Sequence, residues 1–376
     1  MLGFVKQIVK RVFPRIFLKN FYRIVKKTKV AVVDPILFGE YQTKHGEFLL
    51  YRTAFPFREN NVKLDSIQSD RVKNYMRDWY EWPQEEFIFE FRNPVVIEPS
   101  EGWAISRGRK LLYYSLGISR TWFLPKPAFL RYLFRREVTR VPAVISFRDS
   151  GEENYFHFFN DVLAKYFLLK WHNVSFDNKK VVVSKKLFDK PYFQWYLEKS
   201  TEFRKINWLV QDNQYIETSS AIFCKPLTHR KDMLEAVFKP LMIKSPKRRR
   251  LFVTRKKKRL RYIINDVESF FRQRGFEIVD PDTFTVEQQR EIFSEASFIA
   301  GVHGAGLTNM FFAKDCKVLE IFPPPEEGYL PFHYIIMAAM KSFSYDAIIG
   351  EGTKLDMTGG FIVDINKLEV ALKEIS

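Results

Sequence analysis

Two short stretches of this chain combine small and polar residues in patterns suited to chemistry. The first is GVHGAGLTN, residues 301–309, which places three glycines, a histidine and an asparagine between two apolar runs. Each glycine weakens a helix or strand by about 1 kcal/mol relative to alanine, so this density indicates that the backbone comes close to a bound group. Backbone N–H groups at a helix start can bind a phosphate. A tight turn with packing glycines is the alternative.

The second stretch is NYFHFFND, which begins at Asn154. On a helix, Asn154, His157 and Asp161 stand at i, i+3 and i+7 and share one side. The opposite side carries an apolar face made of Tyr155, Phe159, Val162, Tyr166 and Leu169. The polar trio therefore faces solvent or a cleft. We expect Asp161 to act as a general base beside the His157 imidazole, with His157 as the second candidate. Ordinary capping of a solvated helix is the alternative.

The elements that position these stretches alternate along the chain. Residues 31–125 hold short β-like runs, and strand-like and helix-like segments alternate after Val141, with a second alternation from residue 249. Such alternation predicts parallel sheets with helices on both faces. We expect an α/β fold with two lobes and a cleft between them. The predicted boundary is SPKRRR at residue 245, so the lobes are 31–244 and 245–376, and the last helix is a candidate to pack back on the N-terminal lobe.

Ligands of open parallel sheets bind beyond the carboxyl ends of the strands, and GVHGAGLTN is expected at such an end. Glu320 lies in the next predicted strand, VLEIF, and is expected at its end, where an acid could accept hydrogen bonds from ribose hydroxyls. The glycine order is GxxGxG instead of GxGxxG, which counts against an NAD-dependent oxidoreductase. A non-catalytic nucleotide- or RNA-binding protein is a further alternative.

The net charge of +17 is concentrated in two segments. Residues 1–30 contain nine Lys or Arg, residues 245–261 contain ten, and neither contains an acid. Subtracting these nineteen charges from +17 leaves −2 for the rest of the chain. The first segment has apolar residues at helical spacing and basic residues elsewhere, which is typical of an in-plane helix on an anionic membrane. We expect membrane contact through residues 1–27; a helix packed on the body or a disordered arm is the alternative.

Three further features narrow the possible functions. The basic run at 247–261 surrounds a strand and comes with no recognised nucleic-acid module, so we expect no nucleic-acid partner. Asp280 and Asp282 form VDPD, a formal DxD metal motif, which we interpret as turn and cap chemistry. Cys224 and Cys316 are the two cysteines, too few for a disulfide framework, and they indicate a reducing compartment.

Three motifs together resemble glycosyltransferase family 61. NYFHFFND resembles the family's N-[YFW]-x-H-x-x-x-D, and TRKKKRLRYIIN resembles S-R-…-R-x-I-x-N, with Thr254 where serine is usual. GVHGAGLTNMFF followed by VLEIFPP resembles the family's most recognisable block. The motifs span about residues 154–324. The first 140 residues and the tail resemble nothing specific.

The resemblance implies a GT-B fold, with the donor nucleotide on the second lobe and the acceptor on the first. It implies inverting transfer, with no cofactor and no metal, from a nucleotide sugar, by family default a UDP sugar, to a glycan or lipid-linked acceptor. Asn154 is expected on the acceptor side. The expected donor-binding residues are Arg255, Arg261, Asn265, His303, Gly304, Ala305, Gly306, Leu307, Asn309 and Glu320. Arg255 and Arg261 would balance the leaving diphosphate.

The expected cellular setting follows from the termini and the cysteines. No N-terminal apolar run is long enough to span a membrane, and lysines interrupt any signal-peptide core. We therefore expect a cytoplasmic enzyme, peripheral on the inner face of a bacterial cell membrane. Its expected role is in capsular or other cell-surface polysaccharide assembly.

Overall fold

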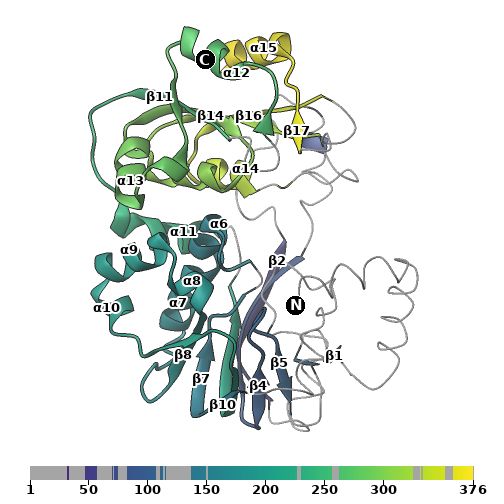
Figure 1. Cartoon of the computed structure of the whole chain (residues 1–376), viewed down its shortest axis with the longest axis vertical. Helices are drawn as coiled ribbons and strands as arrows, with labels where there is room; N and C mark the ends of the chain where they lie inside the picture. The colour runs from purple at the N-terminus through teal and green to yellow at the C-terminus, as the bar shows by residue number, and fades with distance from the viewer. Residues whose placement is uncertain are drawn as a thin grey trace, which may run out of the picture.

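The computed structural model describes most of the chain from residue 83 onward and a few segments before it. The described residues are 32–33, 47–56, 70, 72–74, 83–106, 111–112, 115, 137–149, 151–226, 230–255, 262–324, 331, 333–351 and 359–375. They form two larger sheets and one two-stranded sheet (Figure 1). The predicted membrane segment, residues 1–27, lies outside the described residues.

The first sheet has ten strands, and its centre is parallel. Strands β7 (Val138–Ser146), β8 (Lys180–Ser184) and β9 (Trp208–Gln211) run parallel, and β10 (Tyr215–Lys225) pairs parallel with β7 on its other side. The remaining strands extend the sheet beyond β10 as β1 (Val32–Val33), β2 (Glu47–Pro56), β3 (Pro83–Phe91), β4 (Val95–Ile97), β5 (Ala104–Ser106) and β6 (Leu111–Leu112). The β-like runs expected in residues 31–125 are thus strands of a mixed sheet.

Strand β10 was not predicted, although it pairs with β3, β4 and β7. Its sequence, YIETSSAIFCK, has polar residues in the middle of the apolar run, which hides the strand pattern. In the structure, Thr218 donates its hydroxyl to the carbonyl of Pro142 in β7, at 3.1 Å. Pro142 has no N–H to donate to the ladder, and the Thr218 hydroxyl in the facing strand contacts its carbonyl oxygen.

Helices cover one face of the ten-stranded sheet (Figure 1). The first is continuous through α6 (Tyr155–His157), the π-helical segment η6 (Phe158–Val162) and α7 (Leu163–Trp171). The others are α8 (Lys185–Phe188), α9 (Pro191–Lys199), α10 (Thr201–Arg204), α11 (Lys231–Phe238) and the short η7 (Lys239–Leu241). The apolar face predicted for the first helix packs into the apolar core between these helices and the sheet, because Phe159, Val162 and Leu169 are fully buried.

The second sheet has five strands, all parallel, in the order β13-β11-β14-β15-β16. These strands are β11 (Arg249–Val253), β13 (Glu277–Val279), β14 (Ala296–Val302), β15 (Lys317–Phe322) and β16 (Ser344–Ile349). Helices α12 (Val267–Gln273) and α15 (Ile365–Ile375) pack on one face, and α13 (Val286–Ser294) and α14 (His333–Met340) on the other. The last helix therefore lies on the five-stranded sheet, not on the N-terminal part as suggested.

Short elements complete this part of the chain. They are the 3₁₀ turns η8 (Pro281–Thr283) and η9 (Ala305–Phe312) and the parallel pair β12 (Tyr262–Ile263) and β17 (Gly360–Phe361). The predicted α/β fold with parallel sheets is confirmed. Among the described residues, no helix is both long and apolar enough to cross a membrane.

One apolar core joins the helices of the two larger sheets. Phe238 of α11 stacks on Phe159 of η6, with ring centroids 5.0 Å apart, and on Phe311 of η9, at 4.5 Å. Buried residues of both sheets belong to the same cluster, including Ile145 of β7 and Ile299 of β14. The sheets are therefore held together through packed aromatic rings, and a cleft opens beside this contact.

Candidate active site

A cavity of about 960 Å³ opens where the five-stranded sheet changes its winding direction. The chain goes from β11 to β13 on one side and then returns to place β14 on the other side of β11. The loops that follow β11 and β14 therefore leave in opposite directions and open a crevice between them, where open α/β sheets bind ligands. Arg255 after β11 and Gly304 after β14 both line this cavity, which we call the main cleft.

The two sides of the main cleft come from the two larger sheets. The five-stranded sheet supplies Val253–Arg255, Asp280–Glu287 and Gly304–Gly306, and the helices on the ten-stranded sheet supply Glu153–Tyr155 and residues of α9 such as Trp195. A second contact crosses the cleft where Trp195 donates its indole N–H to Glu287 of α13, at 2.8 Å. The glycine loop and the start of the NYFHFFND helix thus line the same cleft.

Each glycine of GVHGAGLTN allows a close contact within the protein. A Cβ on Gly304 would lie 2.2 Å from Nη1 of Arg255, and a Cβ on Gly306 would lie 3.0 Å from Cγ of Pro281. A Cβ on Gly301 would lie 2.8 Å from Cβ of Val253 in the neighbouring strand. Gly301 and Gly306 therefore serve packing, whereas Gly304 leaves room for a cationic side chain at the cleft.

Arg255 lies across the backbone of the glycine loop. Its Nη1 donates to the carbonyl oxygen of His303, at 3.2 Å, beside the Gly304 Cα. The guanidinium is therefore fixed next to the backbone of Gly304, Ala305 and Gly306, at the start of the 3₁₀ turn η9. A guanidinium beside a turn start is a favourable setting for phosphate oxygens. Arg261 lies outside the described residues, so its expected role stays a prediction.

His303 and Glu320 form a buried pair behind the glycine loop. His303 Nδ1 and Glu320 Oε1 are 2.5 Å apart, and Tyr345 donates its hydroxyl to Glu320 Oε2 at 2.7 Å. Glu320 has no exposed surface and lies within β15, paired with Gly301 of β14, not at the strand end. Burial and the Glu320 charge raise the pKa of Tyr345, so its proton stays in place. The expected position of Glu320 at the strand end is therefore corrected, and each of its carboxylate oxygens has a partner within the protein.

Three other expected donor-site residues have structural contacts. Leu307 is fully buried in the core beneath η9. Asn265 donates its amide to the carbonyl of Val363 and accepts from the Val363 N–H, so it joins the ends of β12 and β17. Asn309 is also fully buried, and its amide Nδ2 donates to the carbonyl of Gly306, at 3.1 Å. Asn309 and Asn265 each use both the N–H group and the carbonyl oxygen of the side-chain amide to hold neighbouring loops in place.

The NYFHFFND motif brings His157 and Asp161 together, as its spacing predicts. Asn154 caps α6 by accepting from the Phe156 N–H, at 2.9 Å, and it also lines the main cleft. His157 Nδ1 and Asp161 Oδ2 are 2.6 Å apart, and Asn160 donates to the other oxygen of Asp161, at 2.7 Å. The Asp161 side chain is 4% exposed and that of His157 is 25% exposed. Of the two expected settings, solvent or a cleft, the first is therefore wrong for Asp161.

Asp161 lies in a buried turn of the helix. Residues Phe158–Val162 are π-helical, and all five of them are buried. Single π-helical turns inside α-helices occur frequently at functional sites. The result is an imidazole at the surface with a buried carboxylate on its Nδ1, an arrangement in which the carboxylate orients the ring.

Asp149 and Lys165 lie behind this pair and were missed by the sequence analysis. Lys165 Nζ is 3.0 Å from Asp149 Oδ2 and donates to the carbonyl of Arg148, at 2.8 Å. Burial raises the pKa of Asp149 to about 6, with the Lys165 charge opposing this rise and the Asp161 charge contributing to it. The spacing in the sequence could have indicated Lys165, because it follows Asp161 by four residues, as Asp161 follows His157, and so lies one turn further along the same side of the helix.

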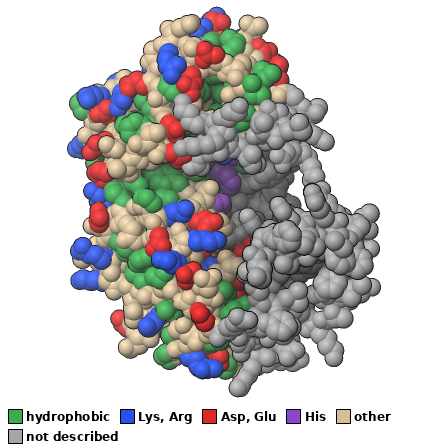
Figure 2. All heavy atoms as spheres, viewed as in Figure 1, with side chains coloured by type: hydrophobic (Ala, Val, Ile, Leu, Met, Phe, Trp, Pro, Cys, Tyr) green, Lys and Arg blue, Asp and Glu red, His purple; other side chains and the backbone are tan. Residues whose placement is uncertain are grey.

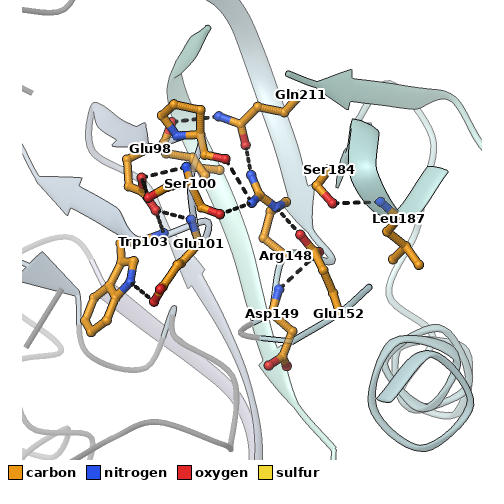
Figure 3. A network of polar contacts seen from close by, with 12 residues as sticks. Glu98, Ser100, Glu101, Trp103, Arg148, Asp149, Glu152, Ser184, Leu187 and Gln211 are labelled. Carbon is orange, nitrogen blue, oxygen red and sulfur yellow. Dashed lines mark hydrogen bonds and ion pairs between the residues drawn. The ribbon is translucent and has the colours of Figure 1, made fainter. Parts of the chain in front are cut away.

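The loop that precedes the motif is anchored by Arg148 (Figure 3). Arg148 Nε donates to Glu152, at 2.8 Å, Nη1 donates to Gln211, and Nη2 donates to the carbonyl of Pro99, at 3.1 Å. These contacts tie together the ends of β7 and β9 and the turn between β4 and β5. A smaller cavity of about 330 Å³ opens there and is lined by Asp149, Gly151 and Glu153 among others. Glu153 also lines the main cleft, so the two cavities adjoin.

The VDPD and basic segments have ordinary structural contacts. Asp280 caps η8 by accepting from the Asp282 N–H, as the turn interpretation predicts. Arg249 pairs with Glu277 and Glu295, and the Arg250 guanidinium lies 4.2 Å from the Phe276 ring centroid. Basic and acidic side chains are interspersed over the described part of the face in Figure 2. No group of three or more His, Cys, Asp or Glu suited to a metal ion occurs in the described part of the chain.

Comparison with known proteins agrees with the resemblance drawn from the motifs. Residues 155–319 match the family model described as Glycosyltransferase 61. The matched range contains His157, Asp161, Arg255 and the whole glycine loop. No curated protein matches the chain. The family prediction is confirmed over these residues.

Proposed function

We propose that this chain, a glycosyltransferase of family 61 through residues 155–319, moves a sugar with inversion from a nucleotide-sugar donor to a hydroxyl of a glycan or glycolipid. We further propose that the two larger sheets form the two lobes of a GT-B fold. The observation that carries the proposal is the main cleft, where Arg255 and the glycine loop lie opposite the start of the helix that bears His157 and Asp161.

The donor diphosphate is placed at Arg255 and the start of η9. Arg255 is held by the His303 carbonyl, so its guanidinium is oriented before a ligand arrives. A fixed guanidinium and neutral N–H donors can take up the charge that develops on a leaving diphosphate, and removal of one such donor commonly costs about 3–4 kcal/mol in the transition state. A UDP sugar is proposed as the donor from the family, and no metal is required by this scheme.

The base is assigned to His157, with Asp161 as its positioning residue. Since Asp161 accepts from Nδ1, the neutral ring has Nε2 as its accepting nitrogen. In the transfer step, the acceptor oxygen bonds to the anomeric carbon while the bond from that carbon to the diphosphate oxygen breaks. The acceptor proton passes to Nε2, and the nearby Asp161 carboxylate stabilises the imidazolium.

The acceptor is placed in the smaller cavity beside His157. Gly151 lines that cavity, and a Cβ on Gly151 would lie 3.7 Å from Nε2 of His157. The cavity lies at the carboxyl ends of β7, β8 and β9, the equivalent position in the first sheet to that of the main cleft in the second. An anionic membrane contact through residues 1–27 and a place in cell-surface polysaccharide assembly at the inner leaflet remain part of the proposal.

Donor hydrolysis and transfer with a panel of nucleotide sugars test the function. We expect one nucleotide sugar to be consumed, and the matching nucleoside diphosphate to raise the thermal midpoint. Stabilisation by NAD or by a short RNA alone, with no nucleoside diphosphate effect, would overturn the proposal.

A further inference from the structure

A chain of buried and partly buried hydrogen bonds links the His157 helix to the glycine loop. Tyr155 of α6 donates its hydroxyl to Oδ1 of Asn309 in η9, at 2.7 Å, although the two residues are 154 positions apart. Tyr155 is the second residue before His157, and Asn309 is the third residue after Gly306. One hydrogen bond therefore connects the two motifs across the contact between the sheets.

The same Asn309 amide holds the rest of the loop. Its Nδ2 donates to the carbonyl of Gly306, at 3.1 Å, and to Oε1 of Gln289 in α13, at 2.9 Å. Gln289 Nε2 donates in turn to the carbonyls of Pro281, at 2.8 Å, and Phe284, at 3.1 Å. The carbonyl of Gly306 can only accept, so Nδ2 must face it and Oδ1 must accept from Tyr155.

The ends of this chain of hydrogen bonds coincide with the walls of the main cleft. Tyr155, Gly306, Gln289 and the segment Pro281–Phe284 all line it. A buried network whose members are all satisfied is rigid, and the loss of one partner leaves another polar group without compensation. The walls that would hold the donor and the helix that holds His157 are therefore tied to one another.

Packing alone also holds the Tyr155 ring, so the hydroxyl has a separable effect. The ring lies edge-on to Phe159, with centroids 5.0 Å apart, and edge-on to Tyr192, at 5.3 Å. Phenylalanine would keep both ring contacts and lose only the hydrogen bond to Asn309. The buried position also raises the pKa of Tyr155, so the hydroxyl keeps its proton.

We infer that Tyr155 and Asn309 are positioning residues that set the place of His157 relative to the glycine loop. They would thereby hold the base at the correct distance from the bound donor. The inference rests on the proposed function. Misplacement of reacting groups by about 1 Å can cost 10²-fold in rate. We expect Tyr155→Phe to lower kcat by about 10-fold to 100-fold while the dissociation constant for the nucleotide changes less than about threefold.

The test compares Tyr155→Phe with Tyr166→Phe. Tyr166 lies on the same helix, and its hydroxyl donates to Glu202 at 3.0 Å, away from both cavities. Each variant is measured for kcat, for KM of the donor, for nucleotide affinity and for thermal midpoint. A role in stability alone would lower the midpoint in both and leave kcat of the folded enzyme unchanged, and this result would overturn the inference.

A double variant keeps the test decisive if one change also reduces stability. If the two side chains act through one hydrogen bond, adding Tyr155→Phe to Asn309→Ala should lower kcat no further. Full additivity of the two effects on kcat would overturn the inference. All kcat values are compared with that of the wild type. If the wild type transfers sugar from no donor, the proposed function is refuted and the inference with it. If the wild type is active and Tyr155→Phe has an unchanged kcat, the inference alone is refuted.

Discussion

Gly304→Ala should separate donor binding from folding, because the new methyl group would collide with Arg255. The added Cβ would stand 2.2 Å from Nη1, and ordinary contact begins at 3.4 Å, so the guanidinium must move. The φ of Gly304 is 161°, an extended conformation that alanine adopts without strain. The atom displaced is the end of a flexible side chain, so we expect little loss of thermal stability.

The expected loss is in affinity for the diphosphate. Moving the guanidinium breaks its 3.2 Å hydrogen bond to the His303 carbonyl and with it the orientation toward the cleft. A hydrogen bond to a charged group contributes about 1.5–3 kcal/mol, so the dissociation constant for the nucleotide should rise by about 10-fold to 150-fold. Calorimetric titration with the nucleoside diphosphate of the accepted donor measures this change.

Two comparison variants make the Gly304 experiment decisive. Gly301→Ala places its Cβ 2.8 Å from Val253 Cβ and 3.0 Å from the Val253 carbonyl oxygen, within the sheet, so it should lower the thermal midpoint. In an Arg255→Ala background, Gly304→Ala should have no further effect on affinity, since its target is gone. Unchanged affinity in Gly304→Ala, or an equal loss in the Arg255→Ala background, would refute the argument.

Three further outcomes are expected. His157→Ala should lower the transfer rate by about 10²–10⁴-fold with nucleotide affinity retained. Asp161→Asn should lower the transfer rate less than His157→Ala does. Equal transfer by His157→Ala and the wild type would remove the base assignment. Glu320→Gln should lower the thermal midpoint, because Glu320 accepts from Tyr345 and pairs with His303 in the core, and nucleotide affinity should stay unchanged; a selective loss of affinity would restore the ribose role. Burial alone would raise the pKa of Glu287, but hydrogen bonds from Trp195, Lys199 and Arg290 outweigh it and lower the pKa to about 2. The stabilisation by Glu287 is therefore complete above its unfolded pKa, about 4.5, and is lost as the pH falls toward 2. When the thermal midpoint is plotted against pH, Glu287→Gln should flatten the acid side of the curve. An unchanged curve would contradict this prediction.

Local patterns in the sequence determined much of the architecture. Apart from the added strand β10, the alternation of strands and helices predicted after Val141 is present, because short apolar runs between turn residues can be recognised locally. The contact between His157 and Asp161 follows from four-residue spacing, and the cap at Asp280 follows from side-chain chemistry two residues away. These features require only neighbours along the chain.

Contacts between distant segments decided the rest. Strand β10 exists because β3, β4 and β7 supply its hydrogen bonds, although its own pattern is interrupted by polar residues. Glu320 turns inward because His303 and Tyr345 satisfy its charge there, and Asn309 faces Tyr155 because aromatic packing brings η6 and η9 together. A carboxylate or amide binds whichever donors the fold places nearest. Its residue type therefore predicts that its hydrogen-bonding groups will be satisfied. Only the tertiary structure decides which partner satisfies them.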